Sequence, residues 1–585
     1  MSDPHENLAE QALANLVNQF ARPLDFLREL VQNSIDAGSP RIEVSIDFDP
    51  PKPGDTVGVT RIQVDDWGEG MDEGIIDNQL TRLFASAKEG DLTKIGKFGI
   101  GFTSIFAILP DAVLLRTGRH GENWELLFHR DRSFDKVRIT DPVDGTKITL
   151  FKRMTREDLD KFIEEARFIL TYWCEHSNVP ITFWDRTEGA RVEEVDEDDP
   201  FAAFESESAA ADPRGPESVN HPLDVEADLS VRLRKDDVEV VAGVASQPLY
   251  GYYNGGLTLL RTRNTDALGQ FEDRLRHLVF KVKNDALEHT LTRDNVLHDK
   301  HWEKAMGVVL EARLRLADAL IDRLARAVEG GEDPTVWQAH LARLCEEIDV
   351  RDKVVDEAGD RPMFRSVLGE PVSLNAAEQG ARRLGAMLVA SDASPLNQAI
   401  HDAHSLKVLQ DTPATRDLLT VTAPAPSWTF RSQRAIQRAE AVFVLPQVLE
   451  SNELDDQERK LVQNTEELLR KAVGRRLGVR IGDFGGPETG TTEALVLNGN
   501  PADRVFQRPS PGGLWSWLPA FMNWRTMLIN RYHPLFRAQL LASTEHPWLA
   551  AAGLASALLH TEDIEGAKVY RHLMSIAHAR LGVTA

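Results

Sequence analysis

The sequence predicts an α+β protein of several domains. Its 585 residues exceed what one hydrophobic core supports, so about three or four domains are expected. Hydrophobic residues make up 42% of the chain, enough to build those cores. Segments with the two-residue period of strands alternate with segments of helical period, and no internal period indicates a solenoid.

The first helix, expected over 27–38, has an apolar face and a polar face. The apolar residues, which fall together at 100° per residue, are Leu27, Leu30, Val31 and Ile35. Opposite them, Glu29, Asn33 and Asp36 share an arc of about 60°. Solvation is the ordinary explanation of such a face, so the helix alone leaves its function open.

The rest of the first domain, expected to span 1–185, alternates strands and helices. Strands are expected where polar and apolar residues alternate, at 41–48, 61–72, 112–118, 124–129 and 145–153. A long amphipathic helix is expected over 155–177, because Thr155 can cap it and acidic residues follow in its first turn.

Three further segments follow the first domain. Residues 186–225 are acidic and rich in Ala, Ser and Pro, which predicts a flexible linker. A middle domain is expected over 226–425, with strands at 228–233, 256–262 and 277–282, a helix over 301–328 and alternating strands and helices over 361–420. The tail, 426–585, is expected to be largely helical, with a charged helix over 455–473 and a strand at 493–500.

Composition narrows the class of partner. A net charge of −25 and a pI near 5.2 disfavour nucleic acid and anionic membranes, which would repel the chain. Cys174 and Cys345 lie far apart, so neither a disulfide framework nor a thiolate metal site is indicated. No apolar run is long enough to span a bilayer, and the N-terminus is acidic, so a soluble cytoplasmic protein is expected.

A glycine run, "KIGKFGIGFTS" (94–104), stands at an expected junction between a loop and a helix. Glycines there let backbone amides approach an anion, and a helix N-terminus adds partial positive charge. Gly96, Gly99 and Gly101 spell GxxGxG, the reverse of the dinucleotide fingerprint, and the segment also misses the P-loop spacing. A phosphate site here would therefore be of another type.

Four segments occur in order within the first 153 residues: "LRELVQNSIDA", "DDWGEGM", "IGKFGIGFTS" and "DGTKITLFKR". They resemble the four ATP-site motifs of the GHKL superfamily, which includes type II topoisomerases, MutL proteins, sensor histidine kinases and the ninety-kilodalton heat-shock chaperones. The first and third are most similar to the chaperones, in their bacterial form. Farther on, 280–296 resembles the chaperones' catalytic loop, 386–419 their later middle domain, and 528–582 their dimerisation domain.

The resemblance implies an N-terminal GHKL (Bergerat-type) α/β sandwich ATPase domain, an α/β middle domain and a largely helical C-terminal dimerisation domain. It also implies ATP and Mg²⁺ as cofactors. Glu29 would be the general base that activates water, and Asn33 would complete the Mg²⁺ shell. Asp36 would bond to neighbouring backbone, and Asp66 would accept a hydrogen bond from the adenine amine.

Other residues around the nucleotide follow from the same resemblance. Gly68 and Gly70 would make room for the base, and Thr146 would support Asp66 through a water. Met71 would lie either against the purine or in the core, and both alternatives stay open. Lys88 would bind phosphate, with an ordinary exposed lysine as the alternative. Backbone amides for the phosphates, and the hinge of a lid over about 72–101, would come from Gly96, Phe98, Gly99, Ile100 and Gly101.

Arg293, in the loop of the middle domain, would reach the γ-phosphate when that domain docks, with a surface ion pair as its alternative. Two residues depart from the chaperone pattern. Gln79 stands where the chaperones carry an Asn, and Leu297 stands where they carry a Gln that faces the nucleotide. We expect the Leu297 departure to slow hydrolysis.

The function implied is an ATP-dependent molecular chaperone, a homodimeric clamp that acts on client proteins. Apolar faces within 526–585 must pack on the same domain or on a second copy, and the resemblance favours a dimer. The alternative is a GHKL ATPase with a regulatory, defence or DNA-repair (MutL-like) role. The repair enzymes place a lysine where this chain has Arg293, and a histidine kinase would carry its phosphoacceptor helix before the nucleotide motifs.

Overall fold

The structure is a computed structural model in which the described residues are 23–81, 100–187, 216–290, 295–384, 386–422, 435–473, 478–484, 496–499, 505–507, 526–558, 574–577 and 579. The chain divides into two compact units, Met1–Leu316 and Ala317–Ala585. Helices and strands mix in both units, as the α+β prediction requires.

An eight-stranded mixed sheet forms the centre of the first unit. Its order is β5-β4-β3-β6-β2-β1-β7-β8, and only the β1–β7 pair is parallel. The strands are β1 (Ile42–Asp49), β2 (Gly58–Asp66), β3 (Ala112–Arg119), β4 (Glu122–His129), β5 (Phe134–Arg138), β6 (Gly145–Met154), β7 (Ile181–Asp185) and β8 (Glu217–Ser218). The five predicted strands are all present, although the one expected over 61–72 ends at Asp66.

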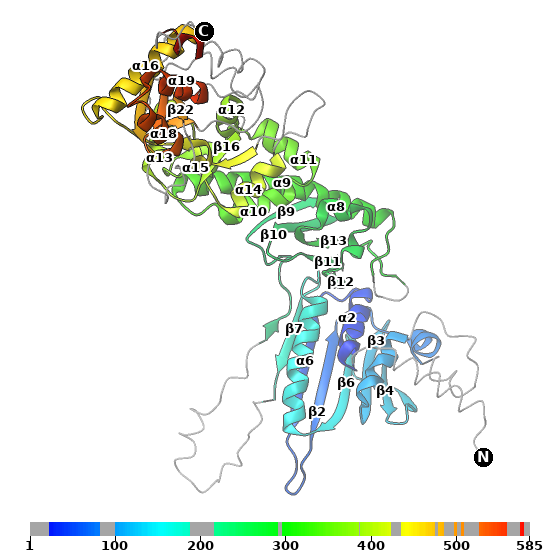
Figure 1. Ribbon diagram of the computed structural model, residues 1–585. Coiled ribbons are helices and arrows are strands. Elements are labelled where there is room, and N and C mark those ends of the chain that lie inside the picture. Colours follow the sequence, from blue (N-terminus) through cyan, green and yellow to red (C-terminus); the bar gives the residue numbers. More distant parts are fainter. Residues whose placement is uncertain are drawn as a thin grey trace, which may run out of the picture. The chain divides into compact units, whose positions relative to one another are not determined.

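Two helices, α2 (Phe26–Asp36) and α6 (Arg156–Cys174), lie side by side on one face of this sheet (Figure 1). The Thr155 hydroxyl caps α6 as predicted, accepting a hydrogen bond from the Asp158 N–H at 3.1 Å. The short segments nearby are η1 (Pro23–Asp25), α3 (Glu73–Ile75), η2 (Ile76–Leu80), α5 (Ile100–Thr103) and η4 (Ser104–Ile108). Leu30, Val64 and Leu170 share one hydrophobic core, which holds α2 and α6 against β2.

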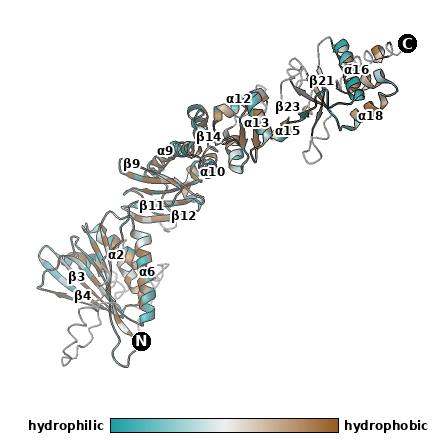
Figure 2. Ribbon diagram, turned by 90° about the vertical axis from the view of Figure 1, so that its left-hand side faces the viewer, coloured by the Kyte–Doolittle hydropathy of each residue, from teal (hydrophilic) through white to brown (hydrophobic). Residues whose placement is uncertain are grey.

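A five-stranded sheet follows in the same unit, in the order β12-β11-β13-β10-β9. Its strands are β9 (Leu229–Lys235), β10 (Val238–Val244), β11 (Leu249–Asn254), β12 (Leu257–Thr262) and β13 (Leu278–Lys283), with helical segments η5 (Thr265–Phe271) and α8 (Glu272–Leu275). Helix α9 (Lys300–Gly330) begins in this unit and continues into the second. Figure 2 shows hydrophobic colouring along these strands, and β10 and β13 are buried over most of their length. Leu257 of β12 packs into the core of the first sheet, so the two sheets are joined.

The described part of the second unit contains three sheets, with orders β14-β15, β17-β16-β18 and β19-β23-β22-β24-β21-β20. Their strands are β14 (Pro362–Arg365), β15 (Pro371–Ser373), β16 (Ala386–Ala390), β17 (Val408–Gln410), β18 (Ala435–Arg438), β19 (Phe443–Val444), β20 (Gln447–Val448), β21 (Gly478–Asp483), β22 (Val496–Gly499), β23 (Phe506–Gln507) and β24 (Thr526–Asn530). The helices are α10 (Thr335–Leu344), α11 (Ile348–Asp352), η6 (Lys353–Glu357), α12 (Leu374–Leu384), α13 (Pro395–His404), α14 (Pro413–Thr422), α15 (Ala439–Val442), α16 (Asp456–Val473), α18 (Pro534–Ala542) and α19 (Pro547–Leu558).

The tail holds more strand than its sequence predicts. Helix α16 and strand β22 stand where they were expected, but they belong to a domain with a six-stranded mixed sheet. Strands β19, β20 and β23 have two residues each, too few to show a two-residue period. In the described part of 526–585, these apolar residues are buried within this unit: Leu528, Ile529, Phe536, Leu540, Leu554 and Leu558. These residues therefore do not by themselves require a second copy.

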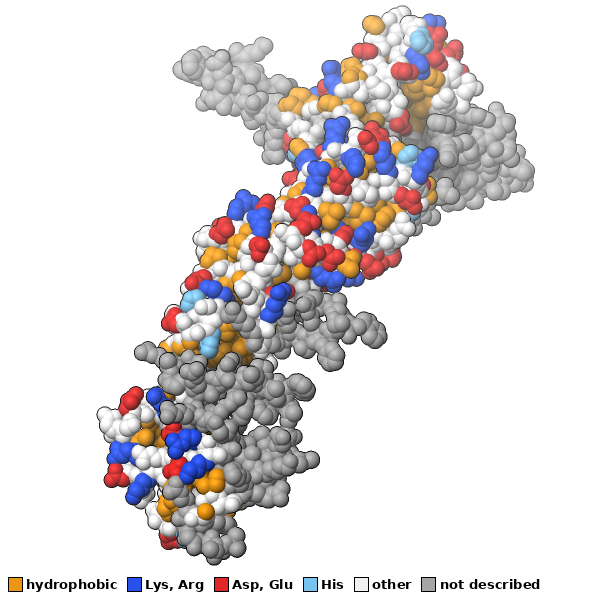
Figure 3. Space-filling model, turned by 90° about the horizontal axis from the view of Figure 1, so that it is seen from above, with side chains coloured by type: hydrophobic (Ala, Val, Ile, Leu, Met, Phe, Trp, Pro, Cys, Tyr) orange, Lys and Arg blue, Asp and Glu red, His pale blue; other side chains and the backbone are white. Residues whose placement is uncertain are grey.

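The surface and the two thiols bear on the compositional predictions. On the face seen in Figure 3, acidic and basic side chains are interspersed over the described residues. Cys174 and Cys345 are both free and buried, and burial raises the pKa of each thiol to about 12. Within the described ranges, no helix combines the length and apolarity needed to cross a bilayer.

Candidate functional site

Asp66, the last residue of β2, has an almost fully enclosed carboxylate. The residue is only 7% exposed. Its Oδ1 accepts hydrogen bonds from the N–H groups of Gly68 (2.9 Å) and Thr146 (3.2 Å), and its Oδ2 accepts one from the Ser34 hydroxyl (3.1 Å). Burial raises the pKa of Asp66, and the three donors oppose that rise. Since a carboxylate oxygen can accept two hydrogen bonds, Oδ2 retains capacity for a donor from a ligand.

Thr117 on β3 connects three parts of this site. Its Oγ1 lies 2.9 Å from the Met71 nitrogen, 3.1 Å from the Gly145 carbonyl oxygen and 3.1 Å from the Thr146 Oγ1. The Met71 N–H can only donate and the Gly145 carbonyl can only accept, so Thr117 donates to Gly145 and accepts from the Thr146 hydroxyl. Separately, the backbone N–H of Thr146 donates directly to Asp66, where a water-mediated link was expected.

The glycines after β2 stand where backbone passes close to backbone. Gly70 has a φ of +66°, and a Cβ there would lie 2.1 Å from the Gly118 carbonyl oxygen. A Cβ at Gly68 would lie 2.7 Å from the Ala37 carbonyl oxygen. We expected these glycines to make room for a base, and close packing of the chain on itself is the reason visible in the structure. Met71 is half-buried and packs against the core of the first sheet.

Helix α2 presents different residues on its two sides. Glu29 is half-buried and Asn33 is exposed, on the side away from the buried Leu27, Leu30 and Val31. Asp36 accepts a hydrogen bond from the Gln32 side chain at 2.9 Å, and the expected bond to neighbouring backbone stays a prediction.

Ser34 and Thr117 are the site residues that the sequence analysis missed. Ser34 carried a usable signal, because it continues the apolar face of α2 one turn after Leu30 and Val31, and a polar residue there needs a buried partner. Thr117 carried none, since a threonine in an alternating strand is ordinary.

The described part of the glycine run is its end. Ile100 and Gly101 are the first residues of α5, so the run leads into a helix as predicted. Lys88, Gly96, Phe98 and Gly99 lie outside the described residues, and their roles stay predictions. Gln79 lies in η2 and is exposed.

Arg293 also lies outside the described residues, but both sides of its loop are described. His289 pairs with Val296 across the stem of the loop, and the Thr290 N–H donates to the Asn295 carbonyl at 2.9 Å. A guanidinium nitrogen of Arg28 lies 3.2 Å from the His289 Nε2. Because Arg28 is next to Glu29 on α2, the stem of the loop stands beside the helix that carries the predicted base.

Two further observations concern the predicted cofactor and the departures. No group of three or more His, Cys, Asp or Glu side chains close enough to hold a metal occurs in the ranges that the structure describes. Magnesium at Asn33 therefore stays a prediction from the resemblance. Leu297, where the chaperones carry a Gln, is 42% exposed.

Comparison with known proteins defines the class of the first domain. Residues 24–153 match the family described as "Histidine kinase-, DNA gyrase B-, and HSP90-like ATPase". The matched segment runs from the turn before α2 into β6 and includes Ser34, Asp66 and Thr146. This part of the chain is a GHKL-type ATPase domain, a class that binds nucleotide.

The curated relatives of this chain include three bacterial proteins named "Chaperone protein HtpG". The protein from Methylococcus capsulatus is 30% identical over 27% of this chain and 28% of its own length. Those from Shewanella oneidensis and Shewanella sp. (strain ANA-3) are 30% and 31% identical over the same shares. The chain thus matches little more than a quarter of the length of these relatives.

Proposed function

We propose that this chain is an ATP-dependent molecular chaperone of the ninety-kilodalton heat-shock type, a cytoplasmic homodimeric clamp that acts on client proteins. The observation that carries the nucleotide part is the Asp66 carboxylate, which is buried, held by Ser34, Gly68 and Thr146, and able to accept one more hydrogen bond. A buried carboxylate acceptor of this kind suits the exocyclic amine of adenine.

The catalytic part rests on the polar side of α2. Glu29 would deprotonate the attacking water, and the side-chain oxygen of Asn33 would hold Mg²⁺, which neutralises charge on the phosphates when bound. The functional groups of both residues suit these roles. Asn33 has an exposed side-chain amide oxygen, and Glu29, one turn before it, has a half-buried carboxylate. The contact between Arg28 and His289 supports a role for Arg293, because it brings the stem of that loop beside α2.

The domain plan is proposed with the function: ATPase domain 1–185, linker 186–225, middle domain 226–425 and dimerisation domain 426–585. The end of the linker segment is not free chain, because Glu217–Ser218 forms β8 of the first sheet and Val219 is buried in its core. The alternative is a GHKL ATPase with a regulatory, defence or DNA-repair role. What keeps it open is the extent of similarity, since the relatives named as chaperones align with only 27% of this chain.

The deciding experiment measures mass by light scattering, ATP hydrolysis, and aggregation of a heat-denatured test protein in ATP and in ADP, each with and without duplex DNA. We expect a dimer, hydrolysis that DNA leaves unchanged, and suppression of aggregation that depends on the nucleotide. Hydrolysis stimulated by DNA, together with no effect on aggregation, would contradict the chaperone proposal and favour the alternative.

A further inference from the structure

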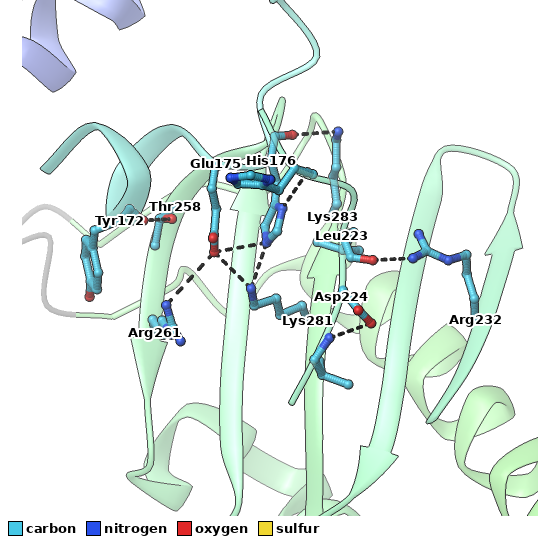
Figure 4. Close-up of polar contacts among 12 residues, drawn as sticks. Tyr172, Glu175, His176, Leu223, Asp224, Arg232, Thr258, Arg261, Lys281 and Lys283 are labelled. Atoms are coloured by element: carbon cyan, nitrogen blue, oxygen red, sulfur yellow. Dashed lines mark hydrogen bonds and ion pairs between the residues drawn. The ribbon is translucent and has the colours of Figure 1, made fainter. Parts of the chain in front are cut away.

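The end of α6 is joined to β13 by polar groups, of which His176 and Lys281 are buried and Glu175 and Lys283 are half-buried. Figure 4 shows Glu175, His176, Lys281 and Lys283, which we call the junction cluster. The Lys281 Nζ lies 2.9 Å from the Glu175 Oε1 and 2.8 Å from the His176 Nε2, and the Lys283 Nζ donates to the His176 carbonyl oxygen at 2.9 Å. Lys281 is only 7% exposed, and a lysine so buried needs partners such as these.

The hydrogen bonds of His176 determine which of its ring nitrogens carries the proton. Its Nδ1 lies 3.0 Å from the carbonyl oxygen of His221, which can only accept, so Nδ1 carries the ring proton. The Nε2 of the neutral ring therefore accepts from the Lys281 ammonium. Lys281 thus contacts two residues at the end of α6, Glu175 and His176. The His176 ring also packs edge-on against the Tyr253 ring of β11, with 4.8 Å between the ring centroids.

Hydrogen bonds to backbone carbonyls hold β12 and the turn before it against the same end of α6. The Asn178 N–H donates to the Gly255 carbonyl at 3.1 Å, and the buried Thr258 hydroxyl donates to the Tyr172 carbonyl at 2.7 Å. A Cβ at Gly256 would lie 1.7 Å from the His176 carbonyl oxygen. No side chain fits between these segments, so their spacing is set by direct contact.

The junction cluster leads straight to the loop that carries Arg293. Strand β13 ends at Lys283, and the next residue, Asn284, is fully buried and donates from Nδ2 to the Asp237 carboxylate at 3.1 Å. The Asn254 side chain donates to the Leu287 carbonyl at 2.7 Å. The path from the end of α6 to the stem of the loop is therefore fixed by hydrogen bonds at successive points.

We propose that Lys281 is a positioning residue for ATP hydrolysis: by tying β13 to the end of α6, it sets the place of the stem of this loop, where His289 pairs with Val296, relative to Glu29. This inference rests on the proposed function, because the role of Arg293 is part of that function. Replacing Lys281 by an uncharged side chain would leave the buried His176 Nε2 without its donor and the half-buried Glu175 with Arg261, at 4.0 Å, as its remaining cation, and β13 would lose its tie to α6.

The kinetic test compares Lys281→Met, Lys281→Arg and a matched control, Lys235→Met. Lys235 lies in the same sheet and makes a surface ion pair with Glu311. We expect Lys281→Met to bind ADP within about threefold of the wild type while kcat falls about 10- to 100-fold, the scale of a small misplacement of catalytic groups. Lys281→Arg should recover much of the loss, and Lys235→Met should resemble the wild type. An unchanged kcat in Lys281→Met would overturn the proposal.

A second readout needs no hydrolysis. Spin labels at Glu157→Cys on α6 and Asp273→Cys on α8 stand at exposed positions, and both native cysteines are buried. The distance distribution between the labels should be narrow in the wild type and in Lys281→Arg and broad in Lys281→Met. If the distance distribution in Lys281→Met broadens while kcat is unchanged, the proposal is overturned. It is also overturned if kcat falls while the distribution stays narrow.

The kinetic and the spin-label measurements together distinguish failure of the proposed function from failure of the Lys281 proposal. A wild-type chain that does not hydrolyse ATP would contradict the proposed function, while the distance distributions would still decide whether Lys281 holds the junction. If Lys281→Met fails to fold, Glu175→Gln takes its place, because it removes one charged partner of Lys281 with little change in shape. The same results are expected from that variant, and the same results would overturn the proposal.

Discussion

Replacing Asp66 by asparagine should abolish nucleotide binding without unfolding the domain. The Gly68 and Thr146 N–H groups both point at Oδ1, so the amide oxygen of an asparagine must stay there and its NH₂ takes the place of Oδ2. The single Ser34 proton faces both the Asp66 Oδ2 and the Leu30 carbonyl, at 3.1 and 3.0 Å, so beside an NH₂ group the hydroxyl can donate to Leu30 alone and accept from that NH₂. The folded chain therefore loses no hydrogen-bond partner.

A bound adenine, in contrast, loses a hydrogen bond in this variant. An adenine amine would meet a donor where it had met a carboxylate, so a hydrogen bond to a charged group is lost, at about 1.5–3 kcal/mol, and a buried amine is left unpaired, at about 1–3 kcal/mol. Taken together these losses amount to about 2.5–6 kcal/mol, which corresponds to at least about 60-fold in ADP affinity.

Isothermal titration with ADP measures this loss, and Asp65→Asn is the matched control. Asp65 is the preceding residue of β2, its side chain lies on the opposite face of the strand, and it accepts a hydrogen bond from Gln63 at 2.8 Å. We expect Asp65→Asn to bind ADP within about twofold of the wild type. Asp66→Asn with an affinity near that of the wild type, or equal losses in the two variants, would refute this account of the site.

Three further predictions follow from other parts of the chain. Burial raises the pKa of Glu175, but the Lys281 ammonium that donates to its carboxylate outweighs burial and holds this pKa at about 2, against 4.5 ordinarily, so its stabilisation is present above pH 4.5 and lost towards pH 2. Urea unfolding at stepped pH should show the wild type losing about 3 kcal/mol more than Glu175→Gln across that window, and equal losses would exclude the effect. Gly70→Ala should lower the melting temperature far more than Gly54→Ala, because both have positive φ but only Gly70 has a carbonyl 2.1 Å from the added Cβ; similar melting temperatures would contradict this. Deleting 426–585 should convert a dimer into monomers that bind ADP normally and hydrolyse ATP more slowly, as scattering and turnover would show, and dimers that persist would place the interface elsewhere. The deletion has to begin at 426, because one that began at 526 would remove the interior strand β24 from its sheet.

Much of the first sheet could be predicted because its strands alternate clearly and α6 carries its own cap at Thr155. The middle strands β10 and β11 were missed for a physical reason. Strand β10 is buried on both faces and reads as the nearly continuous apolar run "VEVVAGV", and β11 contains a glycine, so neither shows a two-residue period.

The candidate site also has features that the sequence predicts and features that it does not. Asp66 and Thr146 could be singled out by motif, and the structure brings them together, but the direct backbone contact between them depends on the pairing of β2 with β6. That pairing is a tertiary fact with no local signal. The contacts of Lys281 with Glu175 and His176 join residues more than a hundred positions apart, so no pattern within one segment predicts them.

The central claim is that this fold binds ATP at Asp66 and hydrolyses it at Glu29. The most direct measurement is ATP turnover of the full chain beside that of Glu29→Ala, with the ATP affinity of both determined by titration. The account predicts affinities within a few fold of each other and a turnover lower by about 10² or more in Glu29→Ala, the scale for loss of a general base. Equal turnover in the two proteins, or loss of ATP affinity with the glutamate, would contradict it.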